Sequence, residues 1–137
     1  MLDIKYVRDN QAAVAEAMEN RHASWDAARF SELDETRRAA IAKEEALQAE
    51  RNAASKSIGA MMGAGQKDEA EAAKERVRAI NDELAVIGKE REAADEALRD
   101  LLLATPNMPA DSTPVGASED DNPEVRRWGT PRDFAAE

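Results

Sequence analysis

The chain has 137 residues, of which 35% are charged and only 4% aromatic, and its formal net charge is −10 at pH 7. This composition suits long solvated helices better than a compact globule. It contains no cysteine, which excludes disulfides and thiolate metal sites, and no apolar run approaches the roughly 18 residues that span a bilayer. Because the N-terminus also lacks the pattern of a signal peptide, we expect a cytoplasmic protein.

The first ten residues mix apolar and charged side chains and predict either a short strand or an irregular turn. Asn10 is a favourable N-cap for a helix over Gln11–Arg21, which carries Val14, Ala17 and Met18 on one face. This short helix is expected to pack against the base of a longer structure.

Ser24 is a second N-cap candidate, for a helical pattern that meets no proline or glycine before Gly59. His22, the only histidine, has no metal-binding or acid–base partner near it in sequence and is expected on the surface. We expect a small apolar cluster at the base rather than a ligand site. Its predicted members are Leu2, Tyr6, Trp25 and Phe30.

Two long stretches carry mostly apolar side chains at alternating steps of four and three, which is the pattern of a coiled-coil seam. The first stripe consists of Leu33, Arg37, Ala40, Glu44, Leu47, Arg51, Ala54 and Ile58. The second consists of Ala73, Val77, Ile80, Leu84, Ile87, Arg91, Ala94, Leu98 and Leu101. If the chain reverses between Gly65 and Gln66, a single register places Leu47 opposite Leu84 and Leu33 opposite Leu98.

The predicted fold is therefore all-α. A long antiparallel two-helix coiled-coil hairpin spans about residues 26–103, with its tip at about 59–67 and a short N-terminal helix packed at its base. Small and charged residues interrupt both stripes, so the seam is expected to be thin and only modestly stable. Asp68 is the expected cap of the returning helix, and Met61 and Met62 are expected to cover the end of the seam.

Thr105-Pro106 is expected to end the second helix, because proline lacks an amide donor and biases the preceding residue out of the helix. Three prolines then predict an extended segment, followed by an acidic and mobile stretch over Ser118–Asn122. Glu124–Gly129 reads as a short strand that ends in a turn. We therefore interpret residues 1–104 as a helical arm domain, and residues 105–137 as a linker toward a further domain.

Charge is distributed unevenly along the hairpin. No acidic residue occurs between Arg51 and Lys67, whereas the base of the second helix is strongly acidic. Local charge governs phosphate contact, since exposed charges are screened beyond about 10 Å at ordinary salt. Two interpretations stay open on this pattern alone: a phosphate-binding surface, or lysines that simply keep a helix face solvated.

No catalytic constellation is visible in the sequence. The glycines near the expected tip do not follow a strand as a nucleotide-binding loop would, and the carboxylates lie on solvated helix faces. These residues alone are therefore not expected to catalyse a reaction.

Several short segments, in order and at matching spacings over essentially the whole chain, resemble the N-terminal region of bacterial seryl-tRNA synthetases. They are residues 2–10 (LDIKYVRDN), 33–38 (LDETRR), 50–59 (ERNAASKSIG), 106–109 (PNMP), 114–116 (PVG) and 121–129 (DNPEVRRWG). In that family this region is an antiparallel coiled-coil arm joined to a class II catalytic domain. The resemblance implies an arm that grips the long variable arm and elbow of serine tRNA.

The resemblance also implies that the parent protein is an ATP- and Mg²⁺-dependent serine–tRNA ligase. It further implies a homodimer that forms through the missing catalytic domain, with the arm acting on tRNA across subunits and with no role for DNA or membranes. No catalytic residue or metal ligand is expected in the chain itself. The residues then expected to contact tRNA are Arg51, Asn52, Ser55, Lys56, Lys67, Lys74 and Arg78. The alternative is a free-standing coiled-coil adaptor that binds protein partners.

Overall fold

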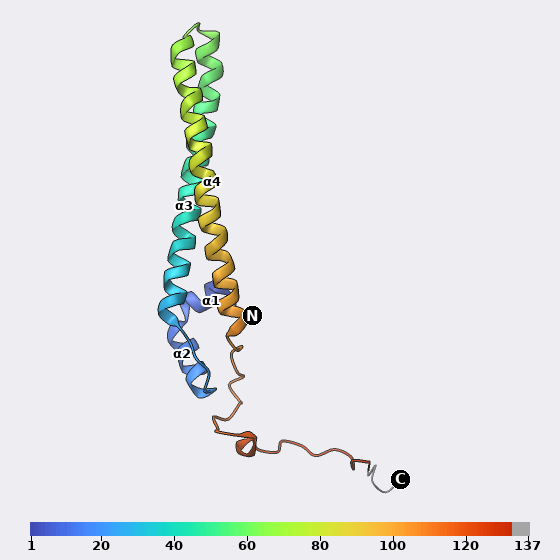
Figure 1. Cartoon of the computed structure of the whole chain (residues 1–137). Coiled ribbons are helices and arrows are strands. Elements are labelled where there is room, and N and C mark those ends of the chain that lie inside the picture. Colours follow the sequence, from blue (N-terminus) through green and yellow to red (C-terminus); the bar gives the residue numbers. More distant parts are fainter. Residues whose placement is uncertain (133–137) are drawn as a thin grey trace.

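The computed structural model describes residues 1–132, and regular structure there is entirely helical. Two short helices, α1 (Ile4–Asp9) and α2 (Gln11–Asn20), precede the long helices α3 (Ala27–Gly63) and α4 (Lys67–Ala104). A 3₁₀ turn, η1 (Glu119–Asp121), is the last element. Figure 1 shows α3 and α4 side by side as an antiparallel hairpin, with α1 and α2 at its base and the C-terminal segment leading away. The predicted all-α hairpin is confirmed.

The seam between α3 and α4 follows the register expected from the sequence. Every residue of the two predicted stripes is buried or half-buried, although the stripes include four charged side chains. In the middle of the arm, Ala40, Leu47, Ile80 and Ile87 form one buried cluster, with Leu84 packed against it. The seam thins toward the tip, because α3 has no buried residue beyond Leu47.

The tip is tighter than the sequence suggested. Gly59 and Gly63 remain within α3, and only three residues, 64–66, connect the two long helices. Gly65 takes a φ of +77°, a left-handed conformation that favours glycine. The Gln66 amide then donates to the Met61 carbonyl over 2.9 Å, which closes the end of α3. Asp68 is therefore not the N-cap of α4; Gln66 holds that position, and Asp68 lies in the first turn.

Of the two methionines at the tip, Met61 is half-buried while Met62 is 49% exposed. Met62 is thus largely open to solvent, and the expectation that both methionines cover the end of the seam stays a prediction for Met61.

The prediction of a strand or irregular turn at the N-terminus was wrong. Residues 4–9 form α1, because the Asp3 carboxylate accepts a hydrogen bond from the Tyr6 amide over 2.8 Å and caps the first turn. The predicted caps of the next two helices also need correction. Asn10 precedes α2, but its side-chain amide donates backwards to the Tyr6 carbonyl instead of capping. Asp26, not Ser24, caps α3 by accepting from the Arg29 amide.

The base holds the main hydrophobic core. Its buried members come from the N-terminal residues, α1, α2, α3 and α4: Leu2, Val7, Val14, Ala17, Met18, Phe30, Leu33, Leu98 and Leu102. Trp25 packs against this cluster at its edge, and its ring lies 5.6 Å from that of Phe30. Tyr6 does not belong to it, since α1 turns this ring outward and leaves the residue 42% exposed. The core thus fixes the two short helices to the foot of the arm.

Past α4 the described chain has no further α-helix. α4 ends at Ala104, before Thr105-Pro106 as predicted; Thr105 is its buried C-cap, and the Thr105 hydroxyl donates to the Leu101 carbonyl. The acidic stretch after it forms η1, closed by a capping box between Ser118 and Asp121. The strand predicted over Glu124–Gly129 is absent, because no neighbouring strand within residues 1–132 supplies its hydrogen bonds. Among residues 1–132, no helix is both long and apolar enough to span a membrane.

Candidate nucleic-acid interface

The residues expected to contact RNA lie on the outer part of the arm, some on α3 and some on α4. Asn52, Ser55 and Lys56 are all exposed on α3. Since side chains three and four positions apart on a helix are neighbours, these three share one outward face. Hydroxyl, amide and ammonium groups on such a face are the donors that phosphate oxygens accept.

Arg51 lies beside this face but belongs to the seam. Its side chain is half-buried, at the level where α4 places the fully buried Ile80. Within residues 1–132 no carboxylate lies within 4.0 Å of the guanidinium. A long basic side chain in this position can run its methylene groups along the seam and present its charge at the edge.

Lys67, the first residue of α4, is exposed at the tip. It too has no ion pair with any carboxylate among the described residues, and the same holds for Lys56. The acid-free run noted in the sequence therefore corresponds in space to a set of unpaired cations, Arg51, Lys56 and Lys67, at the outer end of α3 and the tip.

The two predicted residues further along α4 have a different environment. Lys74 donates to Glu71 over 2.6 Å, and Arg78 donates to Glu75 over 2.5 Å. The Lys74 ammonium, by its hydrogen bond and then its charge, lowers the pKa of the Glu71 carboxyl. Glu71 thus stays ionised at neutral pH and remains a counter-ion for Lys74.

Arg76 was not among the residues that the sequence singled out, yet it links the two helices. Its guanidinium donates to Glu50 of α3 over 2.7 Å and lies 3.7 Å from Glu83 of α4. The hydrogen bond from Arg76 lowers the pKa of the Glu50 carboxyl. The signal in the sequence was the hairpin register itself, which brings Glu50 and Arg76 to nearby levels of the arm.

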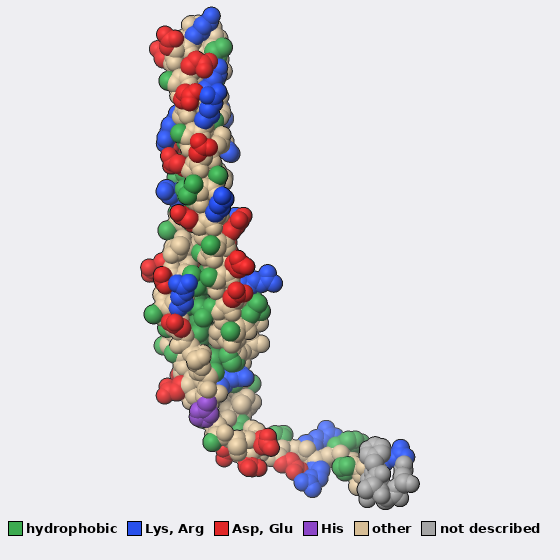
Figure 2. Space-filling model, viewed as in Figure 1, with side chains coloured by type: hydrophobic (Ala, Val, Ile, Leu, Met, Phe, Trp, Pro, Cys, Tyr) green, Lys and Arg blue, Asp and Glu red, His purple; other side chains and the backbone are tan. Residues whose placement is uncertain are grey.

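Toward the base, the charged residues of the two seam stripes form ion pairs between α3 and α4. Arg37 of α3 forms a hydrogen-bonded ion pair with Asp95 of α4. Glu44 and Arg91 approach to 3.6 Å, where Arg91 Nε is buried without a hydrogen-bond partner. Figure 2 shows the result on the face in view, with acidic and basic side chains interleaved along the arm.

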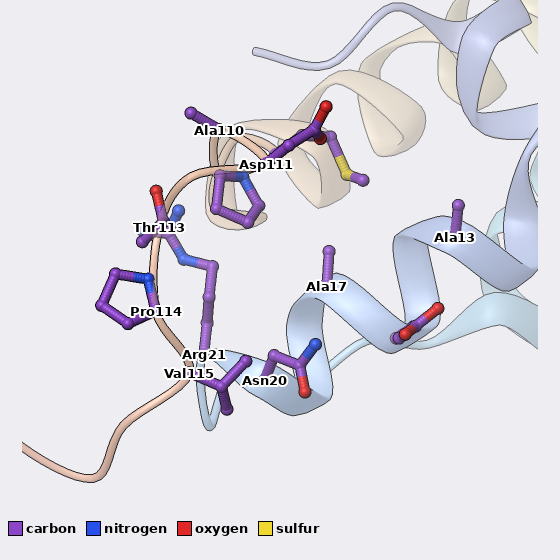
Figure 3. A pocket seen from close by; sticks show the side chains of 12 residues that line it. Ala13, Ala17, Asn20, Arg21, Ala110, Asp111, Thr113, Pro114 and Val115 are labelled. Carbon is purple, nitrogen blue, oxygen red and sulfur yellow. The ribbon is translucent and has the colours of Figure 1, made fainter. Parts of the chain in front are cut away.

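A hollow lies at the base, far along the arm from these residues. It has a volume of about 410 Å³ and lies between α2 and the segment after α4. Figure 3 shows Arg21 reaching from the end of α2 toward Thr113 and Pro114 across this hollow. Arg21 also donates to the Asn107 carbonyl over 2.8 Å, so it ties the segment to α2. None of the residues predicted to bind RNA lines this hollow.

No metal centre is apparent in the described residues, since no three His, Cys, Asp or Glu side chains come together there in a suitable cluster. His22 is exposed at the end of α2, as expected, and has a φ of 52°.

Comparison with known proteins identifies the family. Residues 1–109 match the family described as the seryl-tRNA synthetase N-terminal domain. A serine–tRNA ligase of Neisseria meningitidis serogroup C is 46% identical over 134 residues, which cover 98% of this chain and 31% of that protein. A serine–tRNA ligase of Nitratidesulfovibrio vulgaris is 44% identical over 135 residues, which cover 98% of this chain and 31% of that protein.

A third relative is the serine–tRNA ligase of Francisella tularensis subsp. novicida, 42% identical over 137 residues. That alignment covers all of this chain but only 32% of the relative. The chain thus spans about a third of the length of the curated relatives it matches. From the match over residues 1–109, the chain belongs to the seryl-tRNA synthetase N-terminal domain family.

Proposed function

We propose that this chain is the tRNA-binding arm of a serine–tRNA ligase, an enzyme that attaches serine to tRNA-Ser with ATP and Mg²⁺. The observation that carries the proposal is a hairpin of the seryl-tRNA synthetase family whose outer end presents unpaired cations. In this proposal the arm grips the long variable arm and elbow of the tRNA through its sugar–phosphate backbone. Phosphate contacts carry little base identity, so recognition depends on the shape of the RNA helix.

Seven residues form the proposed tRNA contact: Arg51, Asn52, Ser55, Lys56, Lys67, Lys74 and Arg78. Six of them are exposed or half-exposed polar side chains on solvated helix faces, and Arg51 extends from the seam. Their chemistry supports contact with phosphate oxygens.

The proposal assigns residues 1–104 to the arm and residues 105–137 to a linker toward a class II catalytic domain. ATP and Mg²⁺ would be held by that domain, which would also form a homodimer in which the arm of one subunit binds tRNA for the other. The protein would work in the cytoplasm, where translation takes place. The alternative, a free-standing adaptor for protein partners, is not favoured, because it accounts for the hairpin but not for the family match over residues 1–109.

The test is the salt dependence and mutational sensitivity of tRNA charging by the full-length protein. KM for tRNA should rise with salt with a log–log slope of roughly one per phosphate neutralised. Arg51→Ala and Lys56→Ala should raise KM for tRNA, while serine-dependent pyrophosphate exchange without tRNA should stay unchanged. A thermal melt of each variant separates loss of contact from loosening of the seam, which concerns Arg51 most. If a stable Lys56→Ala variant has an unchanged KM for tRNA, Lys56 only keeps the helix face solvated and does not contact phosphate.

A further inference from the structure

The cations of the outer arm fall into two groups according to their partners. On α3 and at the tip, no carboxylate of the described residues lies within 4.0 Å of Arg51, Lys56 or Lys67. On α4, each of Lys74, Arg76 and Arg78 has a carboxylate within 2.7 Å. Both groups have the same formal charge, and the ion pairs of the second group separate them.

The carboxylates on α4 lie on the same surface as the cations they pair with. Glu71, Lys74, Glu75 and Arg78 follow one another at steps of three, one and three, so they occupy one face of the helix. This face alternates in sign and is close to neutral. A phosphate that recruits Lys74 must displace Glu71 and then remain beside it, so part of the attraction is cancelled by repulsion.

The corresponding face of α3 has no such competitor. Around Asn52, Ser55 and Lys56 the exposed neighbours on α3 three or four positions away are uncharged, namely Gln48, Ala49, Ala53, Gly59 and Ala60. A phosphate can therefore approach the α3 surface closely without meeting a carboxylate. The unpaired ammonium of Lys56 does not have to give up an existing ion pair to bind it.

We propose that the outer arm takes RNA phosphates on its α3 side, and that Glu71 and Glu75 act as built-in competitors that restrain Lys74 and Arg78 from binding RNA. This inference rests on the proposed tRNA-binding function. It divides the proposed contact residues into strong phosphate contacts on the α3 side and weaker ones on α4. Attraction confined to one side of the hairpin holds an RNA helix in one orientation on the arm. Such an arrangement selects RNA by its shape, because RNA that can touch only the α4 side binds more weakly.

The experiment is a double-mutant cycle in the full-length protein, read as the Kd for a serine tRNA transcript at fixed low salt. Lys56→Gln should raise Kd roughly threefold to tenfold, as expected for one lost phosphate contact. Lys74→Gln should change log Kd by less than half the change that Lys56→Gln causes. Glu71→Gln should lower Kd roughly twofold to fivefold, in keeping with the modest strength of an exposed pair.

The decisive variant combines Glu71→Gln with Lys74→Gln. Once the competitor is gone, loss of Lys74 should cost about as much as loss of Lys56 does. Glu92→Gln is the matched control, because it removes the same charge from an exposed position of α4 about 30 Å along the helix from Glu71, well beyond the range of screened charges. It should leave Kd unchanged, and a thermal melt should show each variant folded.

Two results would overturn the inference: a loss for Lys74→Gln equal to that for Lys56→Gln in the presence of Glu71, or a Kd that Glu71→Gln does not lower. Both differ from failure of the proposed function. If the proposed function is wrong, the unsubstituted protein will not bind the tRNA, or Lys56→Gln will leave Kd unchanged. The inference would then fail together with the proposed function.

Discussion

Arg8 of α1 and Asp34 of α3 form a two-point ion pair across 26 residues of sequence. Nε and one terminal nitrogen of Arg8 each donate to a different oxygen of Asp34, both over 2.6 Å. The Asp34 side chain is 3% exposed, and Arg38 adds a third donor at 3.1 Å. Arg8 belongs to α1 at the base and Asp34 belongs to α3 of the arm, so the pair fixes the direction in which the arm leaves its base.

This pair predicts a pH-dependent contribution to stability. Arg8, mainly by its hydrogen bonds, holds the pKa of Asp34 below the ordinary value of 3.8. A depressed pKa means that the stabilisation is present above the unfolded-state pKa and is lost as pH falls through the folded-state pKa. Asp34→Asn should lower the free energy of unfolding at neutral pH by roughly 1–3 kcal/mol, since a partly buried guanidinium loses its partner. The difference from the unsubstituted chain should shrink below pH 4.

Chemical denaturation across the acid range is the measurement, with Glu32→Gln as its control. Glu32 pairs with Arg29 at 2.7 Å on the same helix, but both side chains are largely exposed. That substitution should change stability by less than about 1 kcal/mol at any pH. If the two substitutions lower the free energy of unfolding equally, burial of Asp34 does not strengthen its ion pair.

The seam makes a second prediction, in which burial sets the cost of each truncation. Ile80 is fully buried and Leu84 only half-buried, although both belong to the same stripe. Ile80→Ala should destabilise by about 2–4 kcal/mol and Leu84→Ala by less, because fewer contacts are lost. Val86→Ala is the control on the same helix, since Val86 is 58% exposed. Calorimetric or denaturant unfolding gives the order, and a cost for Val86 equal to that for Ile80 would contradict the register.

Two glycines near the tip predict opposite effects of the same substitution. A methyl group at Gly65 or at Gly63 would meet nothing within 4 Å, so neither site excludes alanine for lack of space. Gly65 has a φ of +77°, where alanine costs roughly 1 kcal/mol or more, whereas Gly63 is the last residue of α3, where alanine gains up to about 1 kcal/mol. Melting temperatures of the two variants should therefore move in opposite directions. A gain at both positions would argue against the three-residue turn.

The isolated 137-residue chain should unfold as a strongly helical protein with no dependence on metal. The basis is that helices account for all regular structure in residues 1–132, and that no candidate metal cluster occurs there. Circular dichroism during heating, with and without a chelator, should give superimposable helical transitions. A chelator-sensitive melt, or a spectrum dominated by strand, would refute this expectation.

The same chain should not activate serine by itself. If the ATP site belongs to the proposed catalytic domain, serine-dependent pyrophosphate exchange by the purified chain should remain at the level of a blank. The full-length protein is the positive control. Exchange above the blank would place the adenylate site within these residues.

The long hairpin could be predicted from the sequence because its signal repeats many times. Each turn of the two stripes gives an independent indication of the same register, and small and charged residues such as Ala54 and Arg91 do not break the period. The ends of the helices carry no such repetition. Ser24 and Asp26 are both good caps two residues apart, and only the carboxylate of Asp26 reaches the Arg29 amide.

The pairing of side chains limited prediction of the candidate site in another way. Composition identifies the acid-free run from Arg51 to Lys67, but it cannot tell that Lys74 has a carboxylate at 2.6 Å while Lys56 has none in the described part of the chain. The α1 helix was missed for a related reason. Six residues are too few for a helical period to show against alternating apolar side chains, and a single Asp3 cap decides the outcome.

The single register about a three-residue turn also limits how the reach of this arm can vary. Seven residues added to α3 keep every seam contact only if seven are added to α4 at the same level. Each paired addition would carry the tip about 10 Å further from the base, whereas an unpaired one would shift the register and leave seven residues of one helix without a partner. The length of the arm can therefore change only in fixed increments, and such a change leaves the Arg8–Asp34 ion pair at the base as it is.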